Sequence, residues 1–290
     1  MKFLVSYVMQ GSIQALSVSA LFGLLSIQIL PAAILCAGVV ALYVLRKGQK
    51  KAFMVFFITI AISYLASQFI PSRPGLDFPI VILLLIPVWL SALVLRATES
   101  QGLAISTAIF CAAVFAIFIE LYSGNAIQWW GEWLKIAVTG IKNASYQGFV
   151  DSGSLKIMNG LMASVLGLCV VLSLLLGRWL QAMIYHPGGF SLEFSNLIVP
   201  RRLLYIIGLI LLICFLINKN LYNDLLIVFS IIYFFQGLAI LHFYAEKNKL
   251  SKSMLVPVYI LIFFLPHYAI IGLASAGVMD TFLNFRKQPK

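Results

Sequence analysis

Strongly polar side chains are rare in the long apolar stretches of this chain, and two of them have the chemistry to hold a ligand. Gln236 lies in the apolar stretch 224–245, and His267 follows Pro266 in the stretch 254–279. A proline inside a helix frees the carbonyl four residues earlier, and a neutral imidazole both donates and accepts hydrogen bonds. We therefore predict that Gln236 and His267 bind a small neutral polar ligand at a helix kink. A packing role, with His267 bonded to the backbone or to Gln236, explains the same residues.

A second chemical pattern is the regular spacing of small residues. Ala33, Ala37 and Ala41 recur at every fourth position, so they share one face of a helix. Small side chains let another helix approach closely in a membrane. This face is a predicted docking site for a partner membrane protein, and packing within the chain is the alternative. The preceding apolar stretch repeats the spacing at Gly11, Ala15, Ser19 and Gly23.

The sequence lacks the common catalytic, phosphate-binding and metal-binding motifs. None of its three histidines is spaced from another histidine or a carboxylate as metal ligands are, and its four cysteines fall singly inside apolar stretches. We expect no enzymatic activity, no cofactor and no metal site. These residues are His186, His242, His267, Cys36, Cys111, Cys169 and Cys214.

The composition identifies the elements that must position these residues. The chain has 290 residues, of which 62% are hydrophobic and 10% charged, whereas soluble domains carry about 25% charged residues. This excludes a soluble enzyme, a disordered chain and a disulfide scaffold. The formal net charge is +11, but the basic residues form short clusters between apolar stretches, which indicates membrane topology rather than nucleic-acid binding.

The apolar stretches predict an all-α, polytopic membrane protein of eight or nine transmembrane helices in a single integral membrane domain, 1–290. About 20 apolar residues cross a bilayer as a helix. Pro31, Pro79 and the turn at 71–75 support several boundaries, and the first stretch is expected to be retained rather than cleaved. Glu120 and Asp224 fall at expected ends of spans, where water would solvate them. The candidate spans are 5–29, 31–45, 52–70, 79–95, 103–121, 158–185, 203–217, 224–245 and 254–279.

The segment 122–157 has a different pattern, which predicts an extramembrane or interfacial segment. Apolar residues, including Trp130 and Trp133, recur there at helical spacing beside Glu132 and Lys135. This is typical of an amphipathic helix that lies in the membrane interface. We prefer this interpretation to a further span, because each charge near the bilayer centre would cost about 2.5–3.5 kcal/mol.

Orientation follows from the loop 46–51, which contains four basic residues and is expected to be cytoplasmic. The rest of the chain leaves two alternatives, each with six basic residues inside. If the helix near 126–141 lies flat, the inside residues are Arg178, Arg201, Arg202, Lys247, Lys249 and Lys252; if it spans, they are Lys142, Lys156, Lys219, Arg286, Lys287 and Lys290.

One stretch carries a family resemblance. It contains Gly177-Arg178-Trp179, then Tyr185-His186-Pro187-Gly188-Gly189-Phe190, Glu193-Phe194 and Pro200-Arg201. About 25 residues of this stretch resemble the YybS-like family of predicted bacterial inner-membrane proteins of unknown function. The resemblance implies a multi-pass protein of the bacterial inner, or cytoplasmic, membrane.

That family is similar in helical layout to the S-components of energy-coupling-factor vitamin transporters. This similarity implies a small molecule held in a helical bundle, and a helix with alanine spacing, matched here by Ala33, Ala37 and Ala41, that docks on a coupling protein. We therefore expect a small-molecule binding or transport component. Its expected partners are the lipid bilayer, another membrane protein and a small polar ligand, with no nucleic acid. The alternative is a structural or assembly factor that binds other membrane proteins.

Overall fold

The structure, a computed structural model, describes residues 2–69, 80–138, 146–248 and 252–286. The expected turn at 71–75, Pro79 and part of the segment 122–157 lie outside these residues. Within the described part of the chain, regular structure is entirely helical and no strand occurs. The α-helices are α1 (Lys2–Gln10), α2 (Ser12–Leu25), α3 (Leu30–Lys47), α4 (Gln49–Ser67), α5 (Ile80–Thr98), α6 (Gln101–Ser123), α7 (Ala126–Val138), α8 (Tyr146–Asp151), α9 (Met158–Tyr185), α10 (Gly189–Ser195), α11 (Arg201–Ile217), α12 (Lys219–Lys247), α13 (Val256–Phe264) and α14 (Pro266–Leu283).

Among the described residues, 6 helices are long and apolar enough to cross a membrane: α3, α4, α5, α6, α9 with the short 3₁₀ turn before it, and α12. The all-helical membrane architecture is therefore confirmed. The other predicted spans correspond to shorter or interrupted helices. The first is divided at Gly11 into α1 and α2, the seventh is the 17-residue α11, and the last is divided at Leu265 into α13 and α14.

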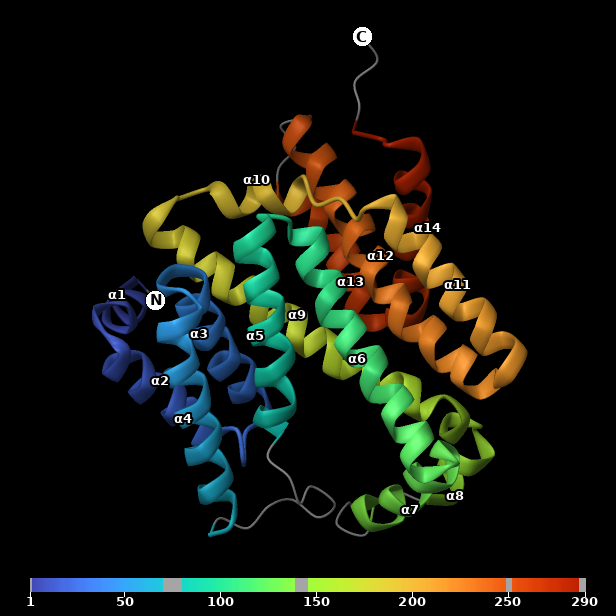
Figure 1. Cartoon of the computed structure of the whole chain (residues 1–290). Coiled ribbons are helices and arrows are strands. Elements are labelled where there is room, and N and C mark those ends of the chain that lie inside the picture. Colours follow the sequence, from blue (N-terminus) through green and yellow to red (C-terminus); the bar gives the residue numbers. More distant parts are fainter. Residues whose placement is uncertain (1, 70–79, 139–145, 249–251, 287–290) are drawn as a thin grey trace.

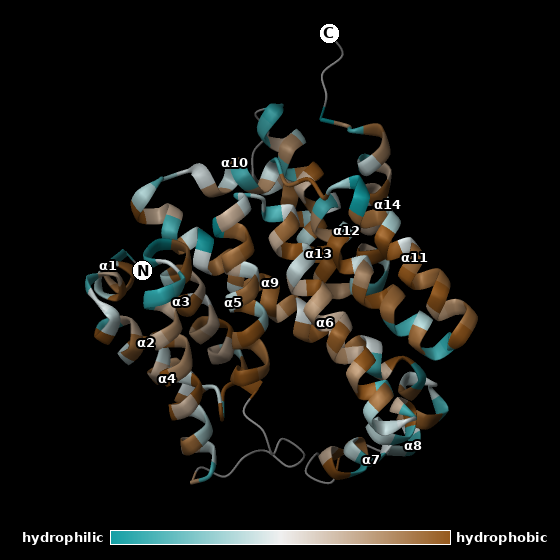
Figure 2. Cartoon of the chain, in the orientation of Figure 1, coloured by the Kyte–Doolittle hydropathy of each residue, from teal (hydrophilic) through white to brown (hydrophobic). Residues whose placement is uncertain are grey.

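Helix α9 is the centre of the arrangement. It crosses the molecule obliquely in Figure 1, with α1–α4 on one side and α11–α14 on the other. It contacts α1, α3, α5, α6 and α12. In Figure 2 the long helices are mostly apolar along their lengths, and hydrophilic residues gather around α10 at one end. The bundle therefore has the apolar outer surface that a bilayer requires.

Local sequence explains where several helices begin and end. Gly48 adopts a positive φ of 87° between α3 and α4, a conformation that is strained for residues with a side chain. The Ser100 hydroxyl accepts a hydrogen bond from the Leu103 N–H at the start of α6. The Asn218 side chain caps α12 in the same way. Such caps satisfy N–H groups that have no partner inside the helix.

Helices α13 and α14 form a hairpin whose two ends lie at the same end of the molecule. The helix stops at Leu265, which has φ −132° and ψ 58°. Tyr259 of α13 contacts His242 near the end of α12, and Tyr244 donates a hydrogen bond to the carbonyl of Phe285, just after α14. Chain reversal at Pro266 thus replaces the single kinked span predicted for 254–279, because the prolyl ring ends the preceding helix instead of bending it.

Basic residues from separate helices meet at one end of the molecule, which we call the basic end. Arg46, Arg96 and Arg178 line one pocket there. The end of α12 lies beside it, because Ser195 of α10 donates a hydrogen bond to Glu246 at 2.8 Å. The arginine at each of three helix ends therefore faces the same side of the bundle.

This arrangement favours the topology alternative in which α7 lies flat. Helix α7 has 13 residues and is about 20 Å long, short of the roughly 30 Å hydrocarbon core. Helices α6 and α9 thus leave and return to the basic end without another crossing between them, which places Arg178 with Arg46. The terminal hairpin brings Arg286 to this end as well, so Arg286 lies with Arg178, although the two alternatives placed these residues on opposite sides.

Candidate functional site

A pocket lined by aromatic and aliphatic side chains lies at the end of the bundle opposite the basic end. It has a volume of about 430 Å³, within the range of about 300–1,000 Å³ that is usual for small-molecule sites. The first turns of α3 and α5 form one wall, and the last turns of α6 together with α7 and the first half of α9 form the other. We call it the tryptophan pocket, after Trp129, Trp130 and Trp133.

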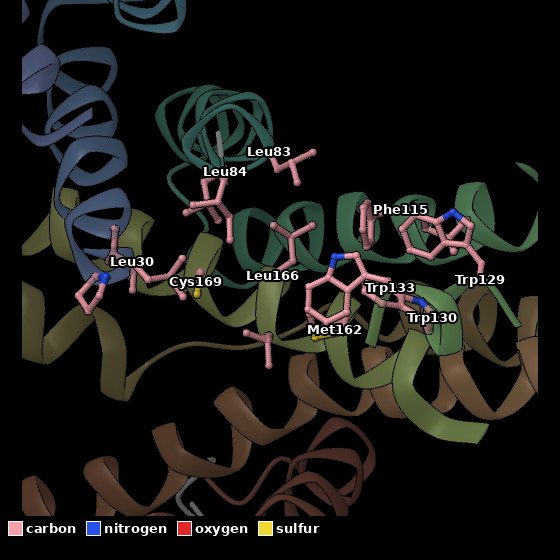
Figure 3. Close-up of a pocket in the computed structure, with 15 residues that line it drawn as sticks. Leu30, Leu83, Leu84, Phe115, Trp129, Trp130, Trp133, Met162, Leu166 and Cys169 are labelled. Carbon is pink, nitrogen blue, oxygen red and sulfur yellow. The ribbon is translucent and has the colours of Figure 1, made fainter. Parts of the chain in front are cut away.

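The three tryptophans are arranged edge to face. The ring centroids of Trp129 and Trp130 are 4.7 Å apart at 84°, and those of Trp130 and Trp133 are 5.5 Å apart at 81°. This is a favoured geometry for aromatic pairs. Figure 3 shows them grouped beside Phe115 and Met162 at one end of the pocket, with Leu30 and Cys169 at the other. The aromatic end offers flat ring faces, and the other end offers an aliphatic lining.

The apolar lining of the pocket disfavours charged ligands. None of the residues that line the pocket is ionised at neutral pH. Transfer of an unpaired ion into such surroundings is strongly unfavourable, whereas apolar surface gains about 25 cal/mol for each Å² removed from water. The pocket therefore suits an apolar molecule or the apolar part of an amphipathic one.

A buried hydrogen-bond network holds the aromatic end in place. The Trp130 indole N–H donates to the side-chain oxygen of Asn159 at 3.1 Å. The Asn159 amide donates to Asp224 at 2.9 Å, and the Gly160 backbone N–H donates to the same carboxylate at 2.9 Å. Asn159 and Asp224 are each 3% exposed. The network joins α7, α9 and α12, so the pocket wall is fixed to the core of the bundle.

Of the two carboxylates near this network, Asp224 is not the solvated cap that we predicted. Asp224 is almost fully buried between α9 and α12, because Gly160 leaves no side chain between the two backbones. Glu120 is half-buried and accepts hydrogen bonds from the Asn218 side chain at 2.7 Å and from the Ala126 N–H at 3.0 Å. Hydrogen bonds satisfy the buried Asp224, whereas Glu120 joins the end of α6 to the starts of α7 and α12 while partly exposed.

Comparison with protein families identifies the family of this chain. Residues 15–281 match the family described as predicted membrane protein (DUF2232). The chain belongs to this family. The expected membership in a family of predicted membrane proteins of unknown function is thereby confirmed. Neither the curated proteins nor the solved structures contain a match to the chain, so the similarity to S-components of vitamin transporters stays a hypothesis for this DUF2232 member.

The structure separates the two predicted ligand-binding residues. Gln236 is fully buried; its amide donates to Asp280 at 2.8 Å, and its oxygen accepts from the Val199 N–H at 3.1 Å. His267 is exposed in the first turn of α14. Thirteen residues of helix, about 20 Å, separate it from Asp280. The predicted pairing of Gln236 with His267 therefore does not occur, because the chain reverses at Pro266.

Gln236 belongs instead to a lock that holds the C-terminal segment. Arg286 forms a buried ion pair with Asp280 at 3.3 Å and donates to the Leu197 carbonyl at 2.5 Å. Burial lowers the pKa of the Arg286 guanidinium, and the adjacent Asp280 opposes this shift. The lock joins α12, α14 and the segment between α10 and α11.

The alanine face predicted to dock a partner is covered by the chain itself. Ala33, Ala37 and Ala41 are each 0% exposed. A side chain added at Gly177 of α9 would come within 2.7 Å of the Ala41 methyl group. The small residues thus let α3 and α9 pack closely, which was the alternative interpretation of the spacing. A partner would reach these alanines only if α9 moved away.

Some residues of this site could have been recognised from the sequence. Asn159 and Asp224 each lie in the first turns of long apolar helices, where a polar residue is costly unless it has a partner. The three tryptophans indicated an interfacial helix, but their spacing does not reveal which helices they face. Only the fold brings them against α6 and α9 and places the first turns of α3 and α5 around the same pocket.

Proposed function

We propose that this protein is a non-enzymatic component of the bacterial inner membrane that binds a small apolar or amphipathic molecule in the tryptophan pocket. The observation that carries the proposal is a cavity of about 430 Å³ with an apolar lining and three tryptophans. The proposed ligand differs from the neutral polar molecule expected from Gln236 and His267, because those residues are elsewhere and already engaged or exposed.

The fixed position of Trp130 supports a binding role. Its indole N–H is bonded to Asn159, which is in turn bonded to the buried Asp224, so the ring is held in one orientation at the pocket wall. Preorganised walls lose little conformational entropy when a ligand binds, so more of the contact energy appears as affinity. The T-shaped pairs around Trp130 hold the neighbouring rings in the same way.

The position of the pocket suits capture of a molecule from the membrane or from outside the cell. It lies opposite the basic end, which we expect to face the cytoplasm. Residues such as Val165, 53% exposed and part of the lining, leave it open at the side. A binding protein of this kind would act alone as a receptor or deliver its ligand to a transporter, as the S-component similarity implies.

The first test fills the pocket without adding polarity. Val165→Trp places a bulky apolar group at the open side, and Leu172→Trp is a matched control, since Leu172 lies on the same helix, is 43% exposed and does not line the pocket. Protein purified from native membranes is analysed by native mass spectrometry and by extraction of bound molecules. We expect the wild type and Leu172→Trp to retain an apolar compound that Val165→Trp has lost.

Two outcomes would contradict the proposal. One is a wild-type protein from which no apolar compound is recovered. The other is equal recovery from both tryptophan variants, which would assign the compound to the outer surface. Thermal unfolding of each variant in detergent establishes that all three proteins are folded before recoveries are compared.

A second candidate function is an assembly factor that binds a helix of another membrane protein. A groove of about 530 Å³ lies between α11, α12 and α14, and Gly208, Ala274 and Ser275 are among its lining. A side chain at Gly208 would meet no atom within 4 Å, so this small residue leaves open space, unlike the alanine face. Gly208→Leu should abolish co-purification of a partner. Gly272→Leu, at an equally open site outside the groove, should preserve it.

A further inference from the structure

A second pocket, at the basic end, has the opposite chemistry from the tryptophan pocket. It has a volume of about 690 Å³ and is lined by the last turns of α3, α5 and α9 together with Glu193 of α10. Its basic side chains are Arg46, Arg96, Arg178 and His186. We call it the arginine pocket. It is made by the opposite ends of three helices that also form the tryptophan pocket, α3, α5 and α9.

One arginine of the pocket is neutralised. Arg178 pairs with Glu193 through two of its nitrogens, of which Nε donates at 2.8 Å, and its third nitrogen donates to Gln181 at 2.5 Å. This residue therefore joins α9 to α10, and its charge is compensated by Glu193. Arg178 therefore forms part of the wall of the arginine pocket.

Arg96 is fixed without being neutralised. Its Nη1 atom donates to the carbonyls of Val44 at 2.9 Å and Leu45 at 3.3 Å at the end of α3. The guanidinium also lies over Gly48, where an added Cβ would be 3.2 Å from it. Within the described residues, no carboxylate lies within 4.0 Å of this guanidinium. Arg96 is thus held in place with its positive charge uncompensated by an ion pair.

Arg46 is held in a similar way by an aromatic ring. Its guanidinium carbon lies 3.9 Å from the centroid of Tyr185. In the described part of the chain, its side chain has neither an ion pair nor a hydrogen bond. A stacked guanidinium keeps its planar set of N–H donors free at the edge. Arg46 therefore presents these donors on a fixed ring.

The turn that carried the family resemblance forms the remaining wall. His186 lines the pocket, and its ring packs so closely on Gly189 that an added Cβ there would lie 2.1 Å from it. Gly188 adopts φ 87° in the same turn. The Pro-Gly-Gly sequence thus positions an imidazole beside the arginines.

We propose that the arginine pocket binds a phosphate group. Two fixed arginines without ion-pair partners, with His186 beside them, match the planar, bidentate recognition of phosphate oxygens by guanidinium groups. Glu99 is the one carboxylate of the lining that has no arginine partner, so basic groups outnumber acidic ones. The phosphate belongs either to an anionic lipid headgroup of the same leaflet or to a soluble phosphorylated molecule. This site is independent of ligand binding in the tryptophan pocket.

The test uses the full-length protein and two probes. Phosphatidylglycerol, or uncharged diacylglycerol for comparison, is titrated into the detergent-solubilised protein. Native mass spectrometry counts the lipid molecules bound to each protein. Glycerol 3-phosphate, compared with chloride at equal ionic strength, is titrated while thermal unfolding is followed. Arg46→Gln is the main variant, because the contact that it removes within the protein is the stacking of Arg46 on the Tyr185 ring. Lys50→Gln, which removes the same charge from the first turn of α4, outside the pocket, is the matched control.

We expect Arg46→Gln to raise the dissociation constant of the effective probe about tenfold, the loss that one charged hydrogen bond accounts for. Lys50→Gln should change it by no more than about twofold, as a solvated charge does. Arg46→Lys should fall between them, since it keeps the charge and loses the planar donors. An effect confined to phosphatidylglycerol assigns the site to a lipid, and one seen with glycerol 3-phosphate assigns it to a soluble molecule. Equal effects of Arg46→Gln and Lys50→Gln would overturn the proposal, as would a wild type that prefers neither probe to its control.

Discussion

The Trp130 indole and the Asn159 amide lie 3.1 Å apart, and this one hydrogen bond connects the wall of an apolar pocket to a buried carboxylate on another helix. A ligand in the pocket would contact a residue whose position depends on α9 and α12. Ligand binding and the packing of the bundle are therefore coupled at Trp130, and that coupling is measurable.

Trp130→Phe should lower the stability of the protein by about 1–3 kcal/mol, because the side-chain oxygen of Asn159 loses its donor in a buried site. Thermal or denaturant unfolding in detergent measures the change. The control is Trp129→Phe, which keeps an aromatic ring in the neighbouring position of the same pocket. If both variants unfold alike, the hydrogen bond has no structural role.

Asp280→Ala should destabilise the protein by about 3–5 kcal/mol, since it leaves the buried Arg286 without its partner. Adding Arg286→Met to this variant should restore much of the loss, because the uncompensated charge is then absent. Limited proteolysis of the C-terminal segment and thermal unfolding report the effect. A double variant no more stable than Asp280→Ala would show that the ion pair does not lock the segment.

Gly277→Ala should separate α12 from α14. The added methyl group would lie 2.1 Å from the Tyr233 carbonyl and 3.0 Å from the Gly237 nitrogen, so the backbones must move apart. We expect a loss of at least about 1–3 kcal/mol. Gly272→Ala, on the same helix with open space around it, should instead gain about 0.5–1 kcal/mol from the better helix propensity of alanine. Opposite signs in thermal unfolding are the expected result; two changes of the same sign would contradict this packing.

The sequence predicts the long helices but not the path of the last apolar stretch, and both results have a physical reason. Hydropathy locates the long helices because the bilayer demands about 20 apolar residues from each. It does not distinguish a kinked span from a hairpin at Pro266, since both contain the same residues and differ in a turn of one residue, Leu265.

The predicted site residues illustrate the same limit. A polar residue such as Gln236 is correctly recognised as needing partners, but Asp280 and Val199, which supply them, come from distant parts of the chain. The spacing of Ala33, Ala37 and Ala41 correctly indicates close helix packing, but it does not state which helix covers them. Partners across the bundle are a property of the fold.

Ala37→Leu tests this last assignment. Because Ala37 is fully buried, a larger side chain should prevent α3 and α9 from packing, and we expect loss of folded protein rather than loss of a bound partner. Ala97→Leu, at an exposed alanine near the end of α5, is the control and should leave folding unchanged. Size-exclusion profiles in detergent separate the outcomes. A well-folded Ala37→Leu protein would mean that the face is less tightly covered than the structure shows.

Gln49→Cys tests the orientation of the whole bundle. Gln49 is exposed at the start of α4, between Lys47 and Lys50, and we expect it to resist an impermeant thiol reagent in intact cells and to react after lysis. A wild-type sample measures the background from the four native cysteines. Rapid labelling in intact cells would place the basic end outside, and the tryptophan pocket would then open towards the cytoplasm.

The contact between Ala41 and Gly177 also has a consequence for biosynthesis. Gly177 follows Ala41 by 136 positions in the chain, and translation at about 5–20 residues per second takes on the order of 10 s to cover that distance. During this interval α3 has left the ribosome and its small-residue face has no α9 to cover it. Nascent chains stalled before residue 158 should therefore expose this face to the insertion machinery, where a photo-crosslinker at Ala37 would detect its temporary neighbour.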